Sequence, residues 1–436
     1  MYILEDLILP KNLKIKAIRK YLKINQQDLV GDKIDRSLIS YVENGKTKLT
    51  RSTANVIALN LRRIIEEKNL DLKVSAEYIF ADESKQAEYL LDTYIEKLNR
   101  LKDSDDEGFR NELAKAEDLL NEWDTASRKA KIYEIAGDYY YEKLSSEKSK
   151  IYYLKSLENY SRLSDYYNMA DINSKLARCA LKKHNYEEAS YINMHVLYMF
   201  GKNNIVNPIL EKRVLFNNAL ANAKLKRYEI SMEMIDRLKT KLGDDERTEY
   251  IDVLMLQANI HVEKCEYQKA LEAYEQILSV SKKIGNREFE AMANNNLGYI
   301  YSLLDDFDKS IYYYTESLHI REEINSRYII LTLVSLAERY LRNNEYDQGK
   351  EYLLRVIQML KSEKDMSIKY KVYDNLIDIY LNSYGIKMDS SICNDIFEFV
   401  KQYRKELEDQ ELIIKLCKYY AKHDLKKVKE IIDIAL

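Results

Sequence analysis

The chain has 436 residues, too many for one compact core and enough for two or three domains or an extended array of repeats. It contains only ten Gly and two Pro, so turn-dense β-sandwiches and glycine-looped α/β folds are not expected. Charged residues make up 32% and apolar residues 46%, a balance that suits amphipathic helices throughout. The composition therefore predicts an all-α protein.

The sequence predicts a cytoplasmic chain without membrane contact. No apolar run approaches the roughly 20 residues needed to span a bilayer. The start, MYILEDLILP, is too short and too acidic for a secretory signal. The cysteines and the five histidines are scattered, so reduced, buried thiols are expected, with no metal and no cofactor. The cysteines are Cys179, Cys265, Cys393 and Cys417.

Charge is distributed unevenly along the chain, whose net charge is −3. Residues 1–69 carry 14 Lys and Arg against 8 Asp and Glu, whereas the remainder carries 55 against 64. A basic head on an acidic body indicates that the head meets a polyanion. Charge alone leaves open that the extra cations only form a solvated surface.

Short helical patterns fill the first 50 residues. Apolar spacing predicts a helix over about 12–22, and Asn25 can cap a second helix, QQDL, with Asp28 at its third position. Asp35 can cap a third helix, RSLISYVEN, which Gly45 can end in a left-handed conformation. A longer apolar-periodic helix follows. The third helix would bury Leu38, Ile39 and Val42 and expose Arg36, Ser37, Ser40 and Tyr41 near its N-terminal end.

This order of helices resembles the helix-turn-helix domain of phage-repressor (Xre-type) proteins. INQQDL followed by SLISYVENGKTK matches the family's Gln-x-x-Leu helix and its I-S-x-x-E-N-G-K stretch. The resemblance implies that Gln26 contacts phosphate and braces the third helix. It also implies that the start of the third helix reads base edges in the major groove of double-stranded DNA. The implied DNA contacts are Gln26, Gln27, Arg36, Ser37, Ser40, Tyr41, Lys46, Lys48 and Arg51.

Two positions depart from the family's pattern. Val30 stands where a small Ala is usual, and Lys33 stands where the turn between the helices usually has Gly. Either change can alter the spacing of the helices, so the docking angle on DNA stays open. The alternative is a three-helix bundle that only resembles a repressor.

A second pattern recurs along the rest of the chain with a period near 40 residues. The stretch 297–318 superimposes on 258–278 and on 337–357, with further copies on the N-terminal side. Each copy has a helix of about a dozen residues, a polar turn, an aromatic residue and a small residue three positions on. Small residues let paired helices approach, and the aromatic fills the wedge between pairs. The aromatics are Tyr186, Tyr228, Tyr267, Phe307 and Tyr346, and the small residues are Ala189, Ser231, Ala270, Ser310 and Gly349.

This pattern resembles the tetratricopeptide repeat, and its best copy contains Leu297, Gly298, Tyr301, Ser310 and Tyr314. Such repeats imply seven units from about residue 130 to 395, followed by a terminal helical cap, in a right-handed superhelix. Residues 70–127 also read as helical and would link the head to the repeats.

A tetratricopeptide array has a concave groove lined by the first helix of each pair. If Gly298 holds the eighth repeat position, Asn259 and Asn295 fall on the inner stripe. Asn amides can bond both backbone groups of an extended peptide, and Arg can hold a carboxylate. The alternative is that Asn is simply common in this chain. The predicted peptide contacts are Asn217, Asn222, Asn259, Asn294, Asn295, Asn296, Arg178 and Arg213; Asn173, Asn375 and Lys131 lie on or beside the same stripe.

A repressor-type head on a tetratricopeptide body resembles the peptide-pheromone regulators of Gram-positive bacteria. These include the NprR, PlcR, PrgX and Rgg groups and the related arbitrium receptors of phages. The resemblance implies a homodimer that binds a double-stranded DNA operator under the control of a short signalling peptide. The expected domains are 1–69 for DNA binding, 70–127 as a helical linker and 128–436 for peptide binding and dimerisation.

Two other functions stay open. A protein-interaction scaffold would use the body alone, with a head that no longer reads DNA. A Rap-like protein would bind a response regulator and promote its loss of phosphate, although Rap proteins normally carry an N-terminal helical bundle in place of a repressor domain. The sequence shows no nucleophile–base constellation, Gly-rich phosphate loop or paired-carboxylate geometry, so an enzyme is not expected.

Overall fold

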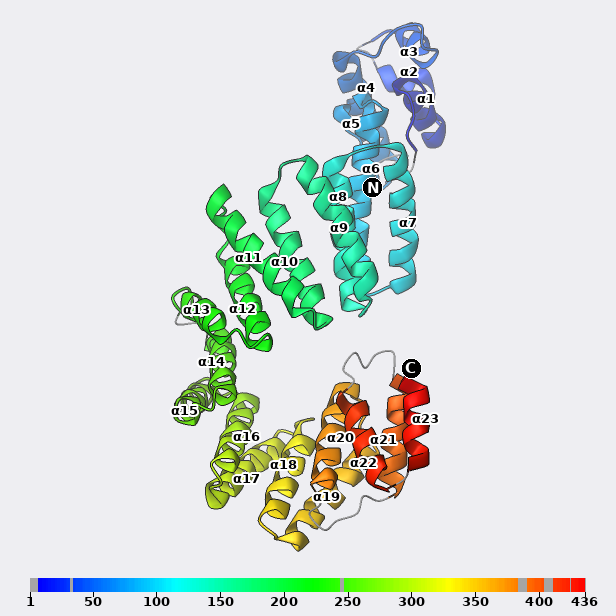
Figure 1. Cartoon of the computed structure of the whole chain (residues 1–436). Coiled ribbons are helices and arrows are strands. Elements are labelled where there is room, and N and C mark those ends of the chain that lie inside the picture. The colour runs from blue at the N-terminus through cyan, green and yellow to red at the C-terminus, as the bar shows by residue number, and fades with distance from the viewer. Residues whose placement is uncertain are drawn as a thin grey trace. The chain divides into compact units, whose positions relative to one another are not determined.

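The computed structural model describes residues 7–31, 34–243, 247–382, 390–403, 411–423 and 425–435 (Figure 1). Within these ranges the regular elements are helices and no β-strand is present. The predicted all-α class with tetratricopeptide-type helix pairs is therefore confirmed. The chain divides into two compact units, Met1–Val214 and Leu215–Leu436.

The first unit begins with a small helical head whose helix ends match the predicted capping residues. Asp28 Oδ2 accepts a hydrogen bond from the backbone N–H of Asn25 at 2.7 Å. Asp35 Oδ1 accepts from the N–H of Ser37 at 2.7 Å, and Gly45 has φ +70°. The head helices are α1 (Lys11–Leu22), α2 (Gln26–Val30), α3 (Arg36–Glu43), α4 (Arg51–Glu67) and α5 (Ala76–Phe80).

The core of the head extends past residue 69. Val74 and Ile79 belong to the same buried cluster as Ile15 and Ile39, so α5 packs against α1 and α4. Lys14 is also buried at this contact, where its ammonium donates to the carbonyl of Tyr78 and lies 4.2 Å from the centre of the Tyr78 ring.

Two further helices lie between the head and the first predicted repeat. α6 (Glu83–Leu101) and α7 (Asp106–Glu122) pack on each other and share one core cluster with the helix that follows. This part of the chain is therefore an additional packed helix pair. The first unit continues with α8 (Ala126–Glu142), α9 (Ser146–Arg162), α10 (Tyr166–Lys182), α11 (Tyr186–Asn203) and the start of α12 (Pro208–Lys224).

The second unit continues the helical pairs. None of the helices within the described ranges is long and apolar enough to cross a bilayer. The remaining helices are α13 (Tyr228–Lys239), α14 (Arg247–Glu263), α15 (Tyr267–Ile284), α16 (Arg287–Leu303), α17 (Phe307–Glu323), α18 (Ile329–Arg342), α19 (Tyr346–Leu360), α20 (Met366–Leu381), α21 (Ser390–Tyr403), α22 (Glu411–His423) and α23 (Leu425–Ala435).

The repeat signature marks the second helix of each pair. The predicted aromatics Tyr186, Tyr228, Tyr267, Phe307 and Tyr346 are each the first residue of such a helix. The small residues three positions later are buried, which lets the paired helices approach closely. In the best copy, the Ser310 hydroxyl donates to the Gly298 carbonyl at 2.9 Å. A Cβ added at Gly298 would lie 2.7 Å from Tyr314 Cδ1, so only Gly leaves room for that ring.

Stacked tyrosine pairs join the two helices of several repeats. The rings of Tyr140 and Tyr152 stack at 5.3 Å between centres, and those of Tyr301 and Tyr313 at 5.4 Å. Tyr340 and Tyr352 stack in the same way at 5.6 Å. In each stack one tyrosine lies on the first helix of the repeat and the other lies on the second helix, after the turn. This recurring contact accounts for part of the high tyrosine content of the chain.

Candidate functional site

The helices α1, α2 and α3 of the head are joined through one buried carboxylate. Glu43, at the end of α3, accepts hydrogen bonds from Arg19 Nε at 2.7 Å, Arg19 Nη2 at 2.9 Å and Gln26 Nε2 at 2.8 Å. Burial raises the pKa of Glu43, but the bonds from Arg19 and Gln26 outweigh burial, so the pKa is lowered and the group stays ionised. Gln26 therefore braces α3; its contact with phosphate stays a prediction.

The residues predicted to read bases lie at the start of α3. Arg36 and Ser37 are exposed in its first turn, Tyr41 is 49% exposed further along, and Ser40 is half-buried. The reading edge, defined as Arg36, Ser37, Ser40 and Tyr41, is therefore open to solvent. Its geometry suits insertion of a helix N-terminus into a major groove.

Exposed cations follow the reading edge along the chain. Lys46 and Lys48 lie in the turn after α3, and the Lys46 ammonium is 6.0 Å from the centre of the Tyr41 ring. Arg51 is exposed as the first residue of α4, where unpaired backbone N–H groups favour phosphate. Gln27 is also exposed, and its amide donates to the Gly31 carbonyl at 3.4 Å.

Of the two positions that depart from the repressor pattern, Val30 lies among the described residues and Lys33 does not. Val30 is fully buried in the core of the head, where its extra volume is accommodated beside Leu29. Lys33 lies outside the described residues.

A pocket of about 420 Å³ lies in the second unit across α12, α14 and α16, the first helices of three successive pairs. Asn259 is exposed in this pocket, and its Oδ1 accepts a hydrogen bond from the Tyr274 hydroxyl at 2.6 Å. Asn296, the next predicted amide along the groove, is half-buried and is not among the described residues that line the pocket. We call this pocket the groove pocket. It is lined by Leu220, Ala223, Lys224, Lys226, Tyr228, Leu256, Asn259, Ile260, Val262, Glu263 and Tyr299.

Two other predicted amides lie away from the pocket lining and are half-buried. Asn295 Oδ1 accepts a hydrogen bond from the Thr332 hydroxyl at 3.0 Å. Asn217 Nδ2 is buried and has no hydrogen-bond partner among the residues that the structure describes. Both residues lie on first helices of repeats, and their contact with a ligand stays a prediction.

The prediction that Asn222 and Asn294 contact a peptide needs correction, because both side chains are buried. Asn222 is 1% exposed, and its Nδ2 donates to the carbonyl of Asn218 at 2.9 Å. Asn294 is 5% exposed and donates to the carbonyl of Glu290 at 3.1 Å. Each amide satisfies a backbone carbonyl one turn earlier in its own helix, so neither is presented to a ligand.

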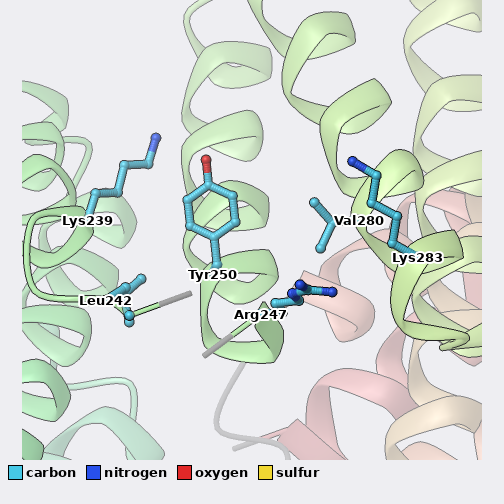
Figure 2. Close-up of a pocket in the computed structure, with 7 residues that line it drawn as sticks. Lys239, Leu242, Arg247, Tyr250, Val280 and Lys283 are labelled. Carbon is cyan, nitrogen blue, oxygen red and sulfur yellow. The ribbon is translucent and has the colours of Figure 1, made fainter. Parts of the chain in front are cut away.

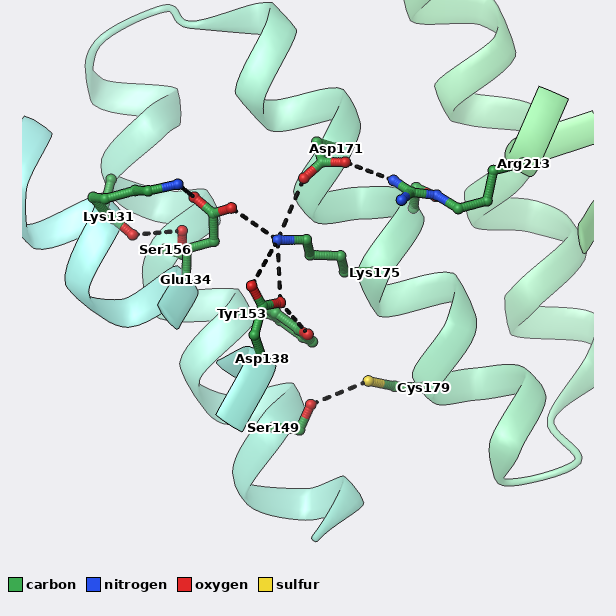
Figure 3. A network of polar contacts seen from close by, with 12 residues as sticks. Lys131, Glu134, Asp138, Ser149, Tyr153, Ser156, Asp171, Lys175, Cys179 and Arg213 are labelled. Atoms are coloured by element: carbon green, nitrogen blue, oxygen red, sulfur yellow. Dashed lines mark hydrogen bonds and ion pairs between the residues drawn. The ribbon is translucent and has the colours of Figure 1, made fainter. Parts of the chain in front are cut away.

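The two predicted arginines lie in the first unit and already have partners there. Arg213 Nη2 donates to Asp171 Oδ1 at 2.6 Å (Figure 3). The guanidinium of Arg178 lies 4.4 Å from the centre of the Tyr141 ring. A carboxylate from outside would therefore compete with Asp171 for Arg213.

Asp171 is part of a larger polar network centred on the buried Lys175 (Figure 3). The Lys175 ammonium lies 2.8 Å from Glu134 Oε1, 3.1 Å from Asp138 and 3.4 Å from Asp171. Burial lowers the pKa of Lys175, but these carboxylates outweigh burial and raise it. The Lys131 ammonium adds a further contact to Glu134 at 3.0 Å. The network is internally neutralised, which points to a structural role.

Sequence reasoning missed several residues that line the groove pocket. Tyr299 directly follows the eighth-position residue Gly298, as Asn259 follows Ala258. Lys224 and Glu263 lie five positions after the equivalent small residues Ala219 and Ala258. The repeat register carried this signal, but the prediction followed Asn, Arg and Lys side chains and left out Tyr299, Lys224 and Glu263.

The cysteines are less uniform than predicted. Cys179 is buried, Cys417 is half-buried and Cys265 is exposed, because it lies in the turn before α15. The side chain of Cys393 lies outside the described residues. Within the described part of the chain, no group of three or more His, Cys, Asp or Glu side chains is arranged to hold a metal ion.

Comparison with known proteins agrees with this architecture. Residues 249–323 match the tetratricopeptide repeat family. The chain is 25% identical over 170 residues to the transcriptional activator NprA of Geobacillus stearothermophilus, covering 38% of this chain and 41% of the relative. It is 23% identical over 185 residues to response regulator aspartate phosphatase I of Bacillus subtilis (strain 168), covering 39% of this chain and 47% of the relative. The chain thus spans less than half the length of these curated relatives.

A solved structure extends the likeness in fold. The apo form of the quorum sensor NprR from B. thuringiensis aligns with a TM-score of 0.50 at 14% identity, covering 81% of this chain and 100% of that chain. The resemblance to tetratricopeptide-repeat quorum-sensing regulators that the sequence indicated is confirmed by these comparisons.

Proposed function

We propose that this chain, a relative of the tetratricopeptide-repeat quorum-sensing regulators, is a DNA-binding transcriptional regulator whose operator binding is controlled by a short signalling peptide. The observation that carries the proposal is the open reading edge on α3, flanked by Lys46, Lys48 and Arg51. A structural three-helix bundle gives no reason for an arginine and a tyrosine to stand exposed beside a row of cations. Similarity to the activator NprA supports the same function.

The chemistry of the head suits a duplex. The head carries an excess of six cations over anions, which favours association with phosphates at moderate salt. Arg36 can bond guanine O6 and N7 together, a contact worth about 1–3 kcal/mol of discrimination against the wrong base. Lys46 and Lys48 then hold the backbone and set the register of the helix on the DNA.

The chemistry of the groove pocket suits an extended peptide. Leu256, Ile260 and Val262 supply apolar wall for one or two side chains. Asn259, oriented by Tyr274, offers an amide to the peptide backbone. Lys224 and Glu263 in the same pocket can select charge in the peptide.

The two sites would be coupled through a homodimer. A dimer presents two reading edges, which must match half-sites about 34 Å apart or a multiple of that distance. A peptide that binds better to the DNA-competent arrangement shifts the population toward it by its difference in affinity.

The test of DNA binding starts with selection of an operator by the full-length chain from a pool of random duplexes. We expect Arg36→Ala to weaken binding to the selected duplex by tenfold or more in fluorescence anisotropy at fixed salt. The control is Arg63→Ala, which removes the same charge from an exposed position on α4, and should change affinity by less than about twofold. Failure to select any duplex, or equal losses in the two variants, would contradict the proposal.

The test of peptide binding uses a pool of synthetic heptapeptides and the melting temperature of the full chain, because a ligand that binds only the folded chain stabilises it, more so the further its concentration exceeds Kd. For a peptide that raises the melting temperature, Asn259→Ala should weaken binding at least fivefold in calorimetry and leave duplex affinity unchanged. Gln358→Ala, an exposed amide truncation on α19, is the control. Unaltered affinity in Asn259→Ala would remove this residue from the site.

A second candidate function rests on the similarity to response regulator aspartate phosphatase I. In that case the repeats would bind a response regulator and the head would not read DNA. Capture of purified response regulators by the full chain, followed by measurement of their phosphate lifetime, separates the two functions. Shortened phosphate lifetime together with no duplex affinity at any salt concentration would favour this second function.

A further inference from the structure

A second pocket lies on the face of α14 opposite the groove pocket. Of the helix's own residues, Arg247 and Tyr250 line this second pocket, and they are three positions apart, so they share one face of the helix. Leu256, Asn259 and Glu263, which line the groove pocket, fall on the other face. The second pocket has a volume of about 320 Å³ and is formed by the end of α13, the start of α14 and the end of α15 (Figure 2). Its lining includes Lys239, Leu242, Arg247, Tyr250, Val280 and Lys283.

The charged side chains of the described lining are all cations. They are Lys239, Arg247 and Lys283, and no Asp or Glu among the described residues lines the pocket. Figure 2 shows the ammonium groups of Lys239 and Lys283 on either side of the Tyr250 hydroxyl. A concave site with one sign of charge concentrates counter-ions of the opposite sign.

Lys239 differs from the buried lysine of the first unit. Lys175 is surrounded by carboxylates that hold its charge, whereas the Lys239 ammonium donates to the neutral amide of Gln257. Burial lowers the pKa of Lys239, and Asp236 offsets only part of that effect. The charge of Lys239 is thus incompletely compensated within the described part of the chain, and an added anion would stabilise it.

The remaining lining defines the kind of anion. Leu242 and Val280 provide apolar surface, and Tyr250 adds a hydroxyl donor. Arg247 is the first residue of α14, so the positive end of the helix dipole lies at the pocket. The volume lies at the lower end of the range for small-molecule sites, roughly 300–1,000 Å³. These features suit a compact organic anion better than a folded partner.

We propose that this pocket is a second ligand site, which binds a small organic anion through Lys239, Lys283 and Tyr250. The anionic group would be a phosphate or a carboxylate, held by the two ammonium groups, with its apolar part against Val280 and Leu242. The site is separate from the groove assigned to the peptide and goes beyond the proposed function. An anion bound here would tie the ends of α13 and α15 to the start of α14.

Calorimetry on the full-length chain tests the site, with pyrophosphate as the phosphate probe and citrate as the carboxylate probe. We expect saturable binding of at least one probe, weakened tenfold or more by Lys239→Gln combined with Lys283→Gln. The matched control combines Lys282→Gln with Lys361→Gln, which changes the net charge equally at exposed lysines outside the pocket. Binding of only one probe identifies the anionic group.

Three outcomes would overturn the proposal. The first is no saturable binding of either probe, and the second is equal weakening in the two double variants. The third concerns Asp244, Asp245 and Glu246, which follow Gly243 in the sequence and lie outside the described residues. If the probes bind only after these three are changed to Asn, Asn and Gln, the chain supplies its own anion and an external ligand is excluded. Duplex and peptide affinities, measured on the same variants, show independently whether the proposed function holds.

Discussion

The side-chain amide of Gln26 donates to Glu43 Oε2 at 2.8 Å, which ties the first residue of α2 to the last residue of α3. Arg19 of α1 reaches the same carboxylate with two bonds. Because α3 is only eight residues long, fixing its end also fixes the direction of Arg36 at its start. The buried carboxylate is thus a positioning residue for the reading edge.

Replacing that carboxylate should damage both stability and DNA binding. Glu43→Ala leaves Arg19 and Gln26 without their acceptor, and we expect a loss of about 2–4 kcal/mol in the unfolding free energy of the head. Urea denaturation of the full chain measures it. Glu66→Ala, an exposed change on α4, is the control and should lie within about 0.5 kcal/mol of the parent. A similar small effect for both variants would show that the brace contributes little.

Lys14 gives the head a pH dependence with a defined sign. Burial, followed by the charge of Lys11, lowers the pKa of Lys14 from 10.5 to about 7, against weaker opposing effects of Asp82 and Glu83. Between these two values the unfolded chain binds more protons than the folded one, so stability rises with pH. The urea midpoint of the head should therefore be higher at pH 9 than at pH 7. Lys14→Met should remove this part of the rise, whereas Lys20→Met, an exposed change, should leave it.

Two glycines within helices should respond oppositely to Ala. Gly298→Ala places a Cβ 2.7 Å from the buried ring of Tyr314, and we expect a net loss of about 1–2 kcal/mol in unfolding free energy. At Gly201 in α11 a Cβ meets no atom within 4 Å, so Gly201→Ala should gain about 0.5–1 kcal/mol from helix propensity. Thermal denaturation of both variants measures the difference. A gain at position 298 would mean that the ring can move aside.

Asn193 in α11 marks a stability defect. It is fully buried, and neither amide atom has a hydrogen-bond partner in the part of the chain that the structure describes. Asn193→Leu, which keeps the branching of the side chain but has larger end groups, removes two unsatisfied groups and should raise the unfolding free energy by about 1–3 kcal/mol. Asn159→Leu is the matched change at a buried amide that donates to the Lys155 carbonyl at 2.8 Å, and it should destabilise. A lower melting temperature for Asn193→Leu would contradict this reading of the site.

Local patterns predicted the elements well. Asp35 and Gly45 marked the ends of α3, and Tyr267 and Phe307 marked the starts of α15 and α17, because capping and close packing act within one turn of the helix. The packing of α6 and α7 as a further pair was not predicted. No aromatic-plus-small signature marks them, so their contact with α8 depends on apolar residues far apart in the sequence.

The site was harder to predict than the fold. Asn259 and Asn222 are both amides on first helices of repeats, yet one is exposed in a pocket and the other is buried. They occupy different positions relative to the small residue at the eighth place, and this offset decides which side chains reach the groove. The number of positions between an amide and the eighth-place small residue cannot be obtained from composition. It can be obtained from a position-by-position alignment of the repeats. The anionic preference of the second pocket depends on Lys239 and Lys283, which come from two helices and carry no joint sequence motif.

The tyrosine stacks have a mechanical consequence. Each stack, such as Tyr301 on Tyr313, pins the two helices of one pair to each other on either side of their turn, so sliding within that pair would separate the rings. The contact between the adjoining pairs at α15 and α16 consists instead of buried apolar residues. We therefore expect a bound ligand to bend the array by rotation at such contacts between pairs. Each pair would move as a rigid body.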